Sequence, residues 1–302
     1  MSLASLFDPS EAALLDISDA PLTPKLSLFD EMFMRSPTPD PQPTTAYRKI
    51  GAGACGAVFA RDGNSEGLAI KLAKVSDNTE LWNDYIRHST ISKHFRRFHP
   101  EIAIPECHFF VPKDTPSYFA NNPDLSKAAT DTCHMPTDVL VTERIHPLPQ
   151  SIRTFLIEKY CPPAARESAL NDPANDDCLV RVYLGSHSRK PSSGMKFFSL
   201  RNFKMHLDQM VDLDIDIETV AKRMGAALAV MHWAARTDAR DVEFVLGSSR
   251  KKTTPLAIDD EKLANMQPKY TGPVGYTNDG CVCRTTQMWV LDFNQARAVE
   301  LR

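Results

Sequence analysis

A glycine-rich run, Gly51-Ala-Gly-Ala-Cys-Gly-Ala-Val-Phe59, limits what this chain can fold into more than any other stretch. Glycines at a G-x-G-x-x-G spacing let the backbone approach a ligand and adopt angles that a side chain forbids. In a dinucleotide-binding site such a run follows a strand and opens a helix. Here Lys49–Phe59 and Leu68–Ala73 predict two strands joined by a turn at residues 62–64. Because the β-type residues Val58-Phe59-Ala60 follow the glycines, the run is predicted to lie between two strands, which argues against a dinucleotide-binding site.

Three further residues follow the glycine-rich run in the order found in protein kinases. Lys71, in Ala69-Ile-Lys71, comes 15 residues after Gly56, where a kinase carries the lysine of its third strand. Asp84 lies on a helix predicted for Thr79–Phe98 and is placed to pair with Lys71 as a kinase glutamate would. Asp292, in Leu-Asp-Phe-Asn, resembles the metal-binding D-F-G element with asparagine in place of glycine. This order predicts an α+β, protein-kinase-like two-lobed fold.

The rest of the chain completes a mixed pattern of elements. Apolar residues that recur at three- and four-residue steps predict a helix over Ile217–Trp233. Strands are predicted for residues 103–112, 139–145, 179–185, 244–247 and 287–293, and a loop for residues 113–137. We expect a partly ordered, proline-rich acidic leader over residues 1–45, an amino-terminal lobe and hinge over 46–150, and a carboxy-terminal, catalytic region over 151–302.

Composition narrows the class of protein further. At 42% hydrophobic and 24% charged residues the chain is typical of a soluble globular protein. No apolar run approaches the ~20 residues that span a bilayer, and the start lacks the pattern of a secretion signal, so we expect a cytoplasmic protein without a membrane partner. The seven cysteines have irregular spacings that predict reduced thiols, although Cys281-x-Cys283 is an unspecific metal or redox motif. We expect neither a metal nor a cofactor.

The loop that gives a protein kinase its chemistry is missing. A kinase carries H-R-D-x-x-x-x-N, whose aspartate orients the acceptor hydroxyl and whose asparagine holds magnesium. Between Met231 and Asp292 there is no such string, and the run His232–Gly247 takes its place. Ordinary kinase activity is therefore not expected.

The replacement run is rich in acids. Three carboxylates occur within six residues, at Asp238, Asp241 and Glu243. Alternation along a strand would put Asp241 and Glu243 on one face. Like charges that close raise each other's pKa, which suits proton transfer or the binding of a cation. The alternative is a structural turn in which Arg236 and Arg240 neutralise these acids.

Together these features resemble a fungal family of kinase-like proteins that includes the arginine-containing cyclodipeptide synthases. The strongest match is Asp241-Val-Glu-Phe-Val-Leu-Gly247, and the resemblance covers roughly residues 45–298. It implies an enzyme that takes arginine from arginyl-tRNA and a second amino acid from another aminoacyl-tRNA. It joins them into a cyclic dipeptide, a 2,5-diketopiperazine. The ester bond to tRNA is already activated, so the reaction needs no ATP.

This reaction suggests roles for the residues singled out above. Glu243 or Asp241 is the candidate for proton transfer, with His232 second, although a histidine at an apolar helix end is more often a packed side chain. Asp238, Asp241 and Glu243 suit bidentate recognition of a guanidinium. The candidate substrate-binding residues are Asp292, Lys71, Gly51, Gly53 and Gly56. A covalent route would require a serine, threonine or cysteine that the sequence does not single out.

Binding of tRNA requires cations, although the net charge of the whole chain is −3. Basic side chains gather in three acid-free runs. The first holds Arg87, Lys93, Arg96 and Arg97, the second Arg189, Lys190, Lys196, Arg201 and Lys204, and the third Arg250, Lys251 and Lys252. Phe197, Phe198 and Phe203 lie within the second run and are candidates for stacking on a single-stranded acceptor end. Each run is equally compatible with an ordinary solvated surface. We expect no DNA partner, and the oligomeric state stays open.

Two other functions fit the same residues. One is an atypical kinase-like phosphotransferase in which Asp241 is the base and Asp292 holds magnesium. The other is a non-catalytic pseudokinase that serves as an interaction scaffold.

Overall fold

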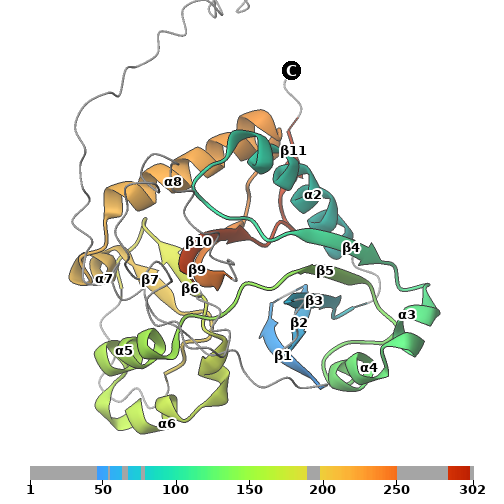
Figure 1. Ribbon diagram of the computed structural model, residues 1–302, viewed down its shortest axis with the longest axis horizontal. Coiled ribbons are helices and arrows are strands. Elements are labelled where there is room, and N and C mark those ends of the chain that lie inside the picture. The colour runs from blue at the N-terminus through green and yellow to red at the C-terminus, as the bar shows by residue number, and fades with distance from the viewer. Residues whose placement is uncertain are drawn as a thin grey trace, which may run out of the picture.

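A computed structural model of the chain describes residues 46–53, 55–62, 67–75, 79–188, 198–249 and 285–299. It has the α+β architecture that the sequence predicts, with sheets of five, four and two strands and helices packed around them (Figure 1). The leader, residues 1–45, and the Cys281-x-Cys283 motif lie outside the described residues. Within the described part, no helix is long and apolar enough to cross a membrane.

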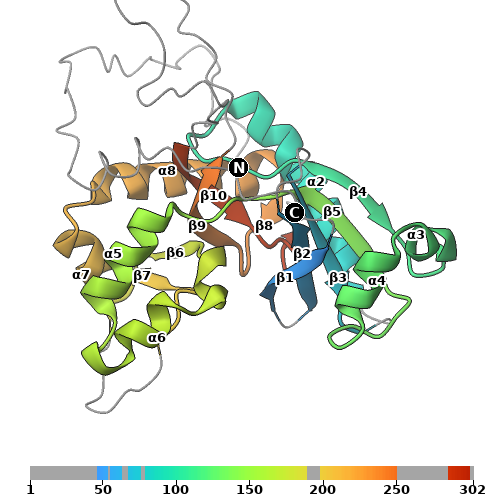
Figure 2. The same cartoon turned by 60° about the horizontal axis from the view of Figure 1, so that its bottom comes forward.

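The five-stranded sheet is antiparallel throughout, in the order β1-β2-β3-β5-β4. Its strands are β1 (Tyr47–Ala52), β2 (Gly56–Arg61), β3 (Leu68–Ala73), β4 (Cys107–Val111) and β5 (Val139–Glu143). The helices on this side of the molecule are α2 (Glu80–Phe98), α3 (Pro116–Asn121) and α4 (Pro123–Ala129) (Figure 2).

The four-stranded sheet has the order β10-β9-β6-β7, in which only β6 and β7 run parallel. Its strands are β6 (Val180–Tyr183), β7 (Lys204–His206), β9 (Glu243–Ser249) and β10 (Thr285–Leu291). The short strands β8 (Thr237–Asp238) and β11 (Arg297–Ala298) pair separately. The helices around it are α5 (Gln150–Tyr160), α6 (Arg166–Leu170), α7 (Leu207–Asp212) and α8 (Ile217–Ala229), which continues into a π-helical turn, Val230–Ala234.

Helix α2 belongs to both halves of the molecule. Its Leu81 packs with residues of the five-stranded sheet. Further along the helix, Ile91 and Phe95 belong to the largest hydrophobic cluster, which also contains Val180 of β6 and Val290 of β10. Burial of large apolar side chains is the main favourable term in folding, so α2 holds the two sheets in one fixed relation.

Three sequence predictions about elements need correction. The strand predicted for residues 103–112 begins only at Cys107, while Ala103 bridges instead to Trp289 of β10. Pro105 lies between the two and has no N–H to donate to a continuous ladder.

Residues 113–137, predicted to be a loop, contain α3 and α4, and each of these helices starts with a proline. Proline favours the first helical position because its φ is already helical, a signal that the sequence prediction missed. Lys49–Phe59 forms two strands, β1 and β2, with the glycine-rich turn between them.

The chain passes from the first sheet to the second directly against β9. His146 exchanges two backbone hydrogen bonds with Ser248, with N···O distances of 3.1 and 2.8 Å. A Cβ atom on the neighbouring Gly247 would lie 2.5 Å from Ile145 Cγ2 and 2.9 Å from Leu179 Cδ2. Glycine at position 247 therefore allows the connection between the sheets to pack onto β9.

Replacing Gly247 should be costly for this reason. We expect Gly247→Ala to lower the free energy of unfolding by about 1–3 kcal/mol, because the added methyl group overpacks the contact. Gly185→Ala is the matched control, since a Cβ atom there has no heavy atom within 4 Å. Urea denaturation followed by circular dichroism measures both variants. Equal stability of the two would show that the contact at Gly247 can relax.

Candidate functional site

The predicted pairing of Lys71 with Asp84 is confirmed, and the lysine has a second partner. Lys71 Nζ lies 2.7 Å from Asp84 Oδ2 and 2.8 Å from Asp292 Oδ1. Burial alone would lower the pKa of Lys71, but the charges of Asp84 and Asp292 outweigh it and raise this pKa above its usual value. The lysine is therefore a permanent cation that joins β3, α2 and the end of β10.

The segment after β10 is also fastened to α2 through its backbone. Asp84 Oδ1 accepts a hydrogen bond from the Phe293 N–H at 3.2 Å. Asn83 donates from Nδ2 to the carbonyl oxygens of Asn294 and Ala296 at 2.8 and 2.9 Å. Asp292 itself has a φ of 66°, in the left-handed region that residues other than glycine seldom adopt. Such a conformation persists where the surroundings fix it, and it is often found at functional sites.

The three glycines of the glycine-rich run have different roles. A Cβ atom on Gly56 would lie 2.9 Å from the Leu72 carbonyl oxygen and 3.2 Å from Lys71 Cγ, so only glycine lets β2 pack this closely on β3. For Gly51 the nearest atom is 3.7 Å away, and for Gly53 there is none within 4 Å. Gly56 therefore positions Lys71, whereas the other two leave open space beside the pocket that they line.

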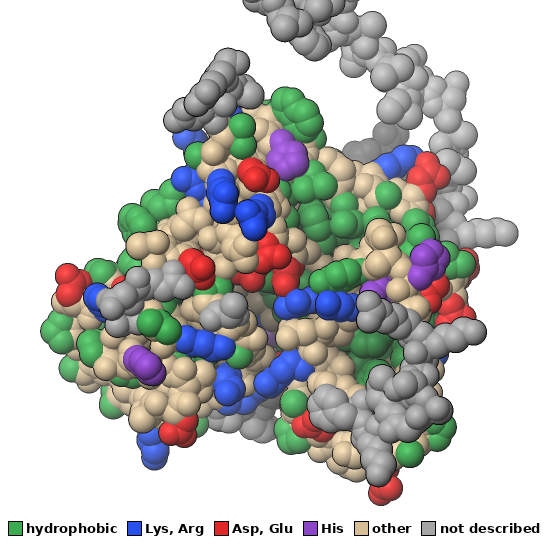
Figure 3. Space-filling model, turned by 180° about the vertical axis from the view of Figure 1, so that it is seen from behind, with side chains coloured by type: hydrophobic (Ala, Val, Ile, Leu, Met, Phe, Trp, Pro, Cys, Tyr) green, Lys and Arg blue, Asp and Glu red, His purple; other side chains and the backbone are tan. Residues whose placement is uncertain are grey.

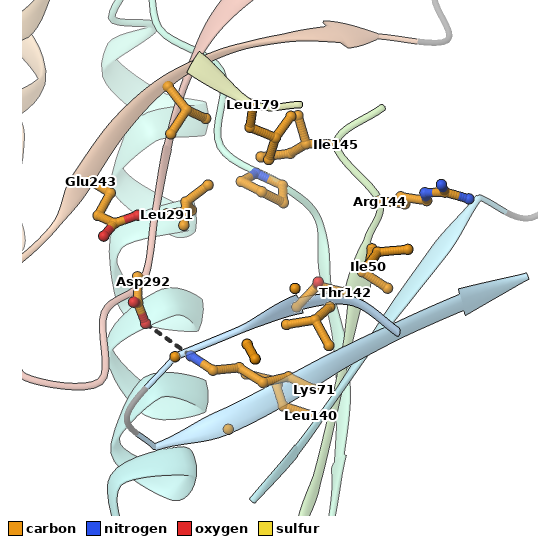
Figure 4. Close-up of a pocket in the computed structure, with 18 of the residues that line it drawn as sticks. Ile50, Lys71, Leu140, Thr142, Arg144, Ile145, Leu179, Glu243, Leu291 and Asp292 are labelled. Carbon is orange, nitrogen blue, oxygen red and sulfur yellow. Dashed lines mark hydrogen bonds and ion pairs between the residues drawn. The ribbon is translucent and has the colours of Figure 1, made fainter. Parts of the chain in front are cut away.

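A pocket of about 230 Å³ opens between the two sheets. In Figure 4, Glu243, Leu291 and Asp292 line one side, and Ile50, Lys71, Leu140 and Thr142 lie across from them. The lining includes four fixed cations and five carboxylates. The cations are Lys71, Arg144, Arg181 and Arg201, and the acids are Asp84, Glu143, Asp177, Glu243 and Asp292. The described lining thus has one carboxylate more than it has fixed cations.

Glu243 and Asp292 come together because of the register of β9 and β10. Leu291, the last residue of β10, is paired with Glu243, the first residue of β9. Glu243 Oε1 accepts from Arg181 Nη1 at 2.9 Å. Burial raises the pKa of Glu243, with Asp292 and Asp241 adding to this effect and Arg181 opposing it. This carboxyl group therefore holds a proton at a higher pH than an ordinary glutamate does.

The predicted acid cluster is more dispersed than strand alternation suggests. Asp241 precedes β9, has a φ of 61°, and accepts a hydrogen bond from Gln295 Nε2 at 2.7 Å. Because β9 begins only at Glu243, the alternation argument that put both acids on one face was wrong. Asp238 is exposed on β8, opposite Arg297 of β11. Of the three acids, Glu243 alone lines the pocket.

Other predicted residues lie outside the pocket. His232 is exposed on the π-helical turn, beside Trp233, and does not line it. Arg236 and Arg240 form no ion pair with the neighbouring acids of the described run 236–243. Proton transfer by His232 and neutralisation by the two arginines therefore find no geometric support.

The predicted tRNA-binding residues fall into three groups. Lys93, Arg96 and Arg97 are exposed on the last turns of α2, and Arg87 is half-buried, with its Nε 3.4 Å from Asn83 Oδ1. Arg201 lines the pocket, and Lys204 Nζ lies 5.0 Å from the centre of the Tyr183 ring. Figure 3 shows lysine and arginine side chains gathered in the middle of one face, close to acidic ones. Arg189, Lys190, Lys196, Phe197, Arg250, Lys251 and Lys252 lie outside the described residues.

Sequence reasoning missed Arg181 as a site residue. It stands between Val180 and Val182, both buried in the largest hydrophobic cluster, and points to the opposite face of β6. A single arginine inside an apolar strand was the available signal.

No protein-family model, curated protein or solved structure matches the chain.

Removal of Lys71 tests how much its ion pairs contribute to the stability of the fold. We expect Lys71→Met to lower the free energy of unfolding by about 3–5 kcal/mol, because it leaves the buried Asp84 and the partly exposed Asp292 without their counter-ion. Lys222→Met is the control, since Lys222 pairs with Glu218 on the surface of α8 and should leave the unfolding midpoint unchanged. A Lys71→Met protein as stable as the parent would contradict the assigned role.

Proposed function

We propose that this chain is a tRNA-dependent cyclodipeptide synthase with a protein-kinase-like fold. It joins arginine from arginyl-tRNA to a second aminoacyl group. The observation that carries this proposal is the excess of carboxylates in the pocket, where Glu243 and Asp292 stand side by side. An arginyl ester carries two cations, the guanidinium and the α-ammonium, and such a site attracts both. The sequence resemblance described above supports the same activity.

The kinase-like fold is supported by the order of the site elements along the chain. A glycine-rich hairpin, a strand lysine paired with an acid on the next helix, and an aspartate after a late strand occur in the order of a kinase. A nucleoside triphosphate, however, brings several negative charges. The four cations of the lining are already outnumbered by its acids, so a cationic ligand suits the pocket better.

Each of the two central acids keeps one oxygen for a ligand. Lys71 contacts Asp292 through Oδ1, and Arg181 contacts Glu243 through Oε1. No hydrogen bond or ion pair in the described part of the chain engages Asp292 Oδ2 or Glu243 Oε2. In our proposal Asp292, positioned by its contact with Lys71, binds the guanidinium, and Glu243 faces the α-amine. Charge-assisted hydrogen bonds of this kind are among the strongest in proteins.

The chemistry balances without a cofactor. The amine nitrogen of one aminoacyl group attacks the ester carbonyl of the other, a C–N bond forms, and the C–O bond to the ribose breaks. Glu243 takes the proton from the attacking amine and gives it to the departing ribose oxygen. The same sequence of steps between the second amine and the second ester closes the ring and releases the second tRNA.

The direct test is product formation. Purified protein, tRNA, aminoacyl-tRNA synthetases, ATP to charge the tRNA, and amino acids should yield cyclo-Arg-Xaa by mass spectrometry, and ribonuclease should abolish it. We expect Glu243→Gln to lower the rate by roughly 100-fold or more, since it removes a proton-transfer group. Glu218→Gln, on the exposed face of α8, is the control and should keep full activity. Absence of any cyclic dipeptide, or full activity of folded Glu243→Gln, would overturn the proposal.

The pH dependence of the rate follows from the direction of the Glu243 shift. Its pKa lies above the ordinary 4.5, and the ionised form is the proton acceptor. Activity should therefore fall as the pH is lowered through this raised pKa, which places the acid limb above pH 4.5. A pH profile of kcat/KM under single-turnover conditions measures it. The residual activity of Glu243→Gln should lack this limb, and an unchanged limb would assign it to another group.

A phosphotransferase is the second candidate, favoured by the 2.7 Å contact between Lys71 and Asp84. Asp238 and Glu243 also have the spacing of the kinase D-x-x-x-x-N, with glutamate in place of asparagine. Glu243 and Asp292 would then hold the divalent cation. A thermal shift with Mg-ATP that is lost in Asp292→Asn, together with the absence of cyclic dipeptide, would favour this function. Absence of both activities would favour a scaffold.

A further inference from the structure

Part of the pocket lining is a short segment, Arg201 and Asn202, that a buried asparagine holds in place. Asn175 is 3% exposed, and its Oδ1 accepts from the Leu200 N–H at 2.6 Å and from Ser199 Oγ at 3.2 Å. Its Nδ2 donates to the Ala169 carbonyl oxygen at 2.7 Å. Ser199 Oγ in turn accepts from the Arg201 N–H at 3.1 Å. Because these partners are buried and satisfied, the position of Arg201 is fixed by the fold.

Arg201 is a cation without a counter-ion in the described part of the chain. The two other arginines that line the pocket both have carboxylate partners. Arg144 lies 3.0 Å from Asp62, and Arg181 lies 2.9 Å from Glu243. Arg201 lines the pocket and has no carboxylate within ion-pair distance among the described residues. An arginine without a counter-ion can form charge-assisted hydrogen bonds, so an anionic ligand in the pocket would gain affinity here.

The next residue links Arg201 to the two central acids. Asn202 has a φ of 59°, and its Oδ1 accepts from Arg181 Nη2 at 3.3 Å. Arg181 reaches Glu243 with its other terminal nitrogen. The lining therefore offers an unpaired cation at Arg201 and, beyond Arg181, the second carboxylate oxygens of Glu243 and Asp292. A ligand that matches it has an anionic group joined by a short neutral spacer to a cationic one.

A charged tRNA ends in such a group. The phosphodiester on the 5′ side of its terminal adenosine is one ribose away from the aminoacyl ester, whose ammonium is a cation. We propose that Arg201, with Arg181 and Asn202 behind it, binds this last phosphodiester while the aminoacyl group reaches Glu243 and Asp292. This inference rests on the proposed function. It gives Arg201 a separate task from the exposed cations of α2, which would contact the tRNA further away.

Two non-reactive probes test the phosphate contact without any turnover. Adenosine 5′-monophosphate mimics the terminal nucleotide with its phosphate, and adenosine lacks only that group. Calorimetry on the full chain should give the monophosphate roughly 10- to 100-fold higher affinity than adenosine, as expected for charge-assisted contacts to phosphate. Arg201→Ala should remove this gap, and Arg201→Lys should restore part of it, because lysine keeps the charge and loses the fork. Lys222→Ala, on α8, should keep the whole gap.

The second measurement uses turnover, so that the two proposals fail separately. With 3′-arginyl-adenosine and its 5′-phosphate as minimal substrates, Arg201→Ala should raise KM for the phosphorylated one alone and leave kcat unchanged. A parent protein without an affinity gap, or an Arg201→Ala protein that keeps it, would overturn the phosphate assignment even if cyclic dipeptide forms. An Arg201-dependent gap without any cyclic dipeptide would uphold the assignment and overturn the proposed reaction. If inorganic phosphate binds in an Arg201-dependent way but adenosine 5′-monophosphate binds no better than adenosine, the assignment to a nucleic-acid end is overturned.

Discussion

The ion pairs of Lys71 are the interaction on which the rest of the structure depends. The lysine comes from a central strand of one sheet, Asp84 from the helix that both halves share, and Asp292 from the end of the other sheet. Asp84 also holds the Phe293 N–H, so one carboxylate fixes a side chain and a backbone at once. In a poorly solvated place such charges are tolerated only together. The pocket exists because these three segments are held at this distance.

The same groups stabilise the fold and define the chemistry of the pocket. Lys71 contacts one carboxylate oxygen of Asp292, which leaves the other for a ligand. Arg181 contacts one carboxylate oxygen of Glu243 in the same way. Burial nevertheless raises the pKa of Glu243, because its effect outweighs the opposing charge of Arg181.

The sequence was sufficient to predict Lys71, Asp84 and Asp292, because each belongs to a strongly patterned element and the order of the elements is informative. It was insufficient for Asp241 and Glu243, since alternation holds only within a strand and the left-handed backbone at Asp241 ends the pattern. Arg201 was assigned to RNA because of its basic neighbours. Its place at the pocket depends on Asn175, which binds the neighbouring Leu200 across 25 residues, a contact that no local pattern contains.

The ladder of β9 and β10 keeps its two described ends far apart. Glu243 pairs with Leu291 at one end, and Ser249 pairs with Thr285 at the other, about 20 Å away at the usual rise per residue. The connecting residues, 250–284, leave from the distant end. A backbone shift at the Ser249–Thr285 pair would therefore have to pass along the whole ladder to reach Glu243 and Asp292, and the hydrogen bonds between the two strands resist it.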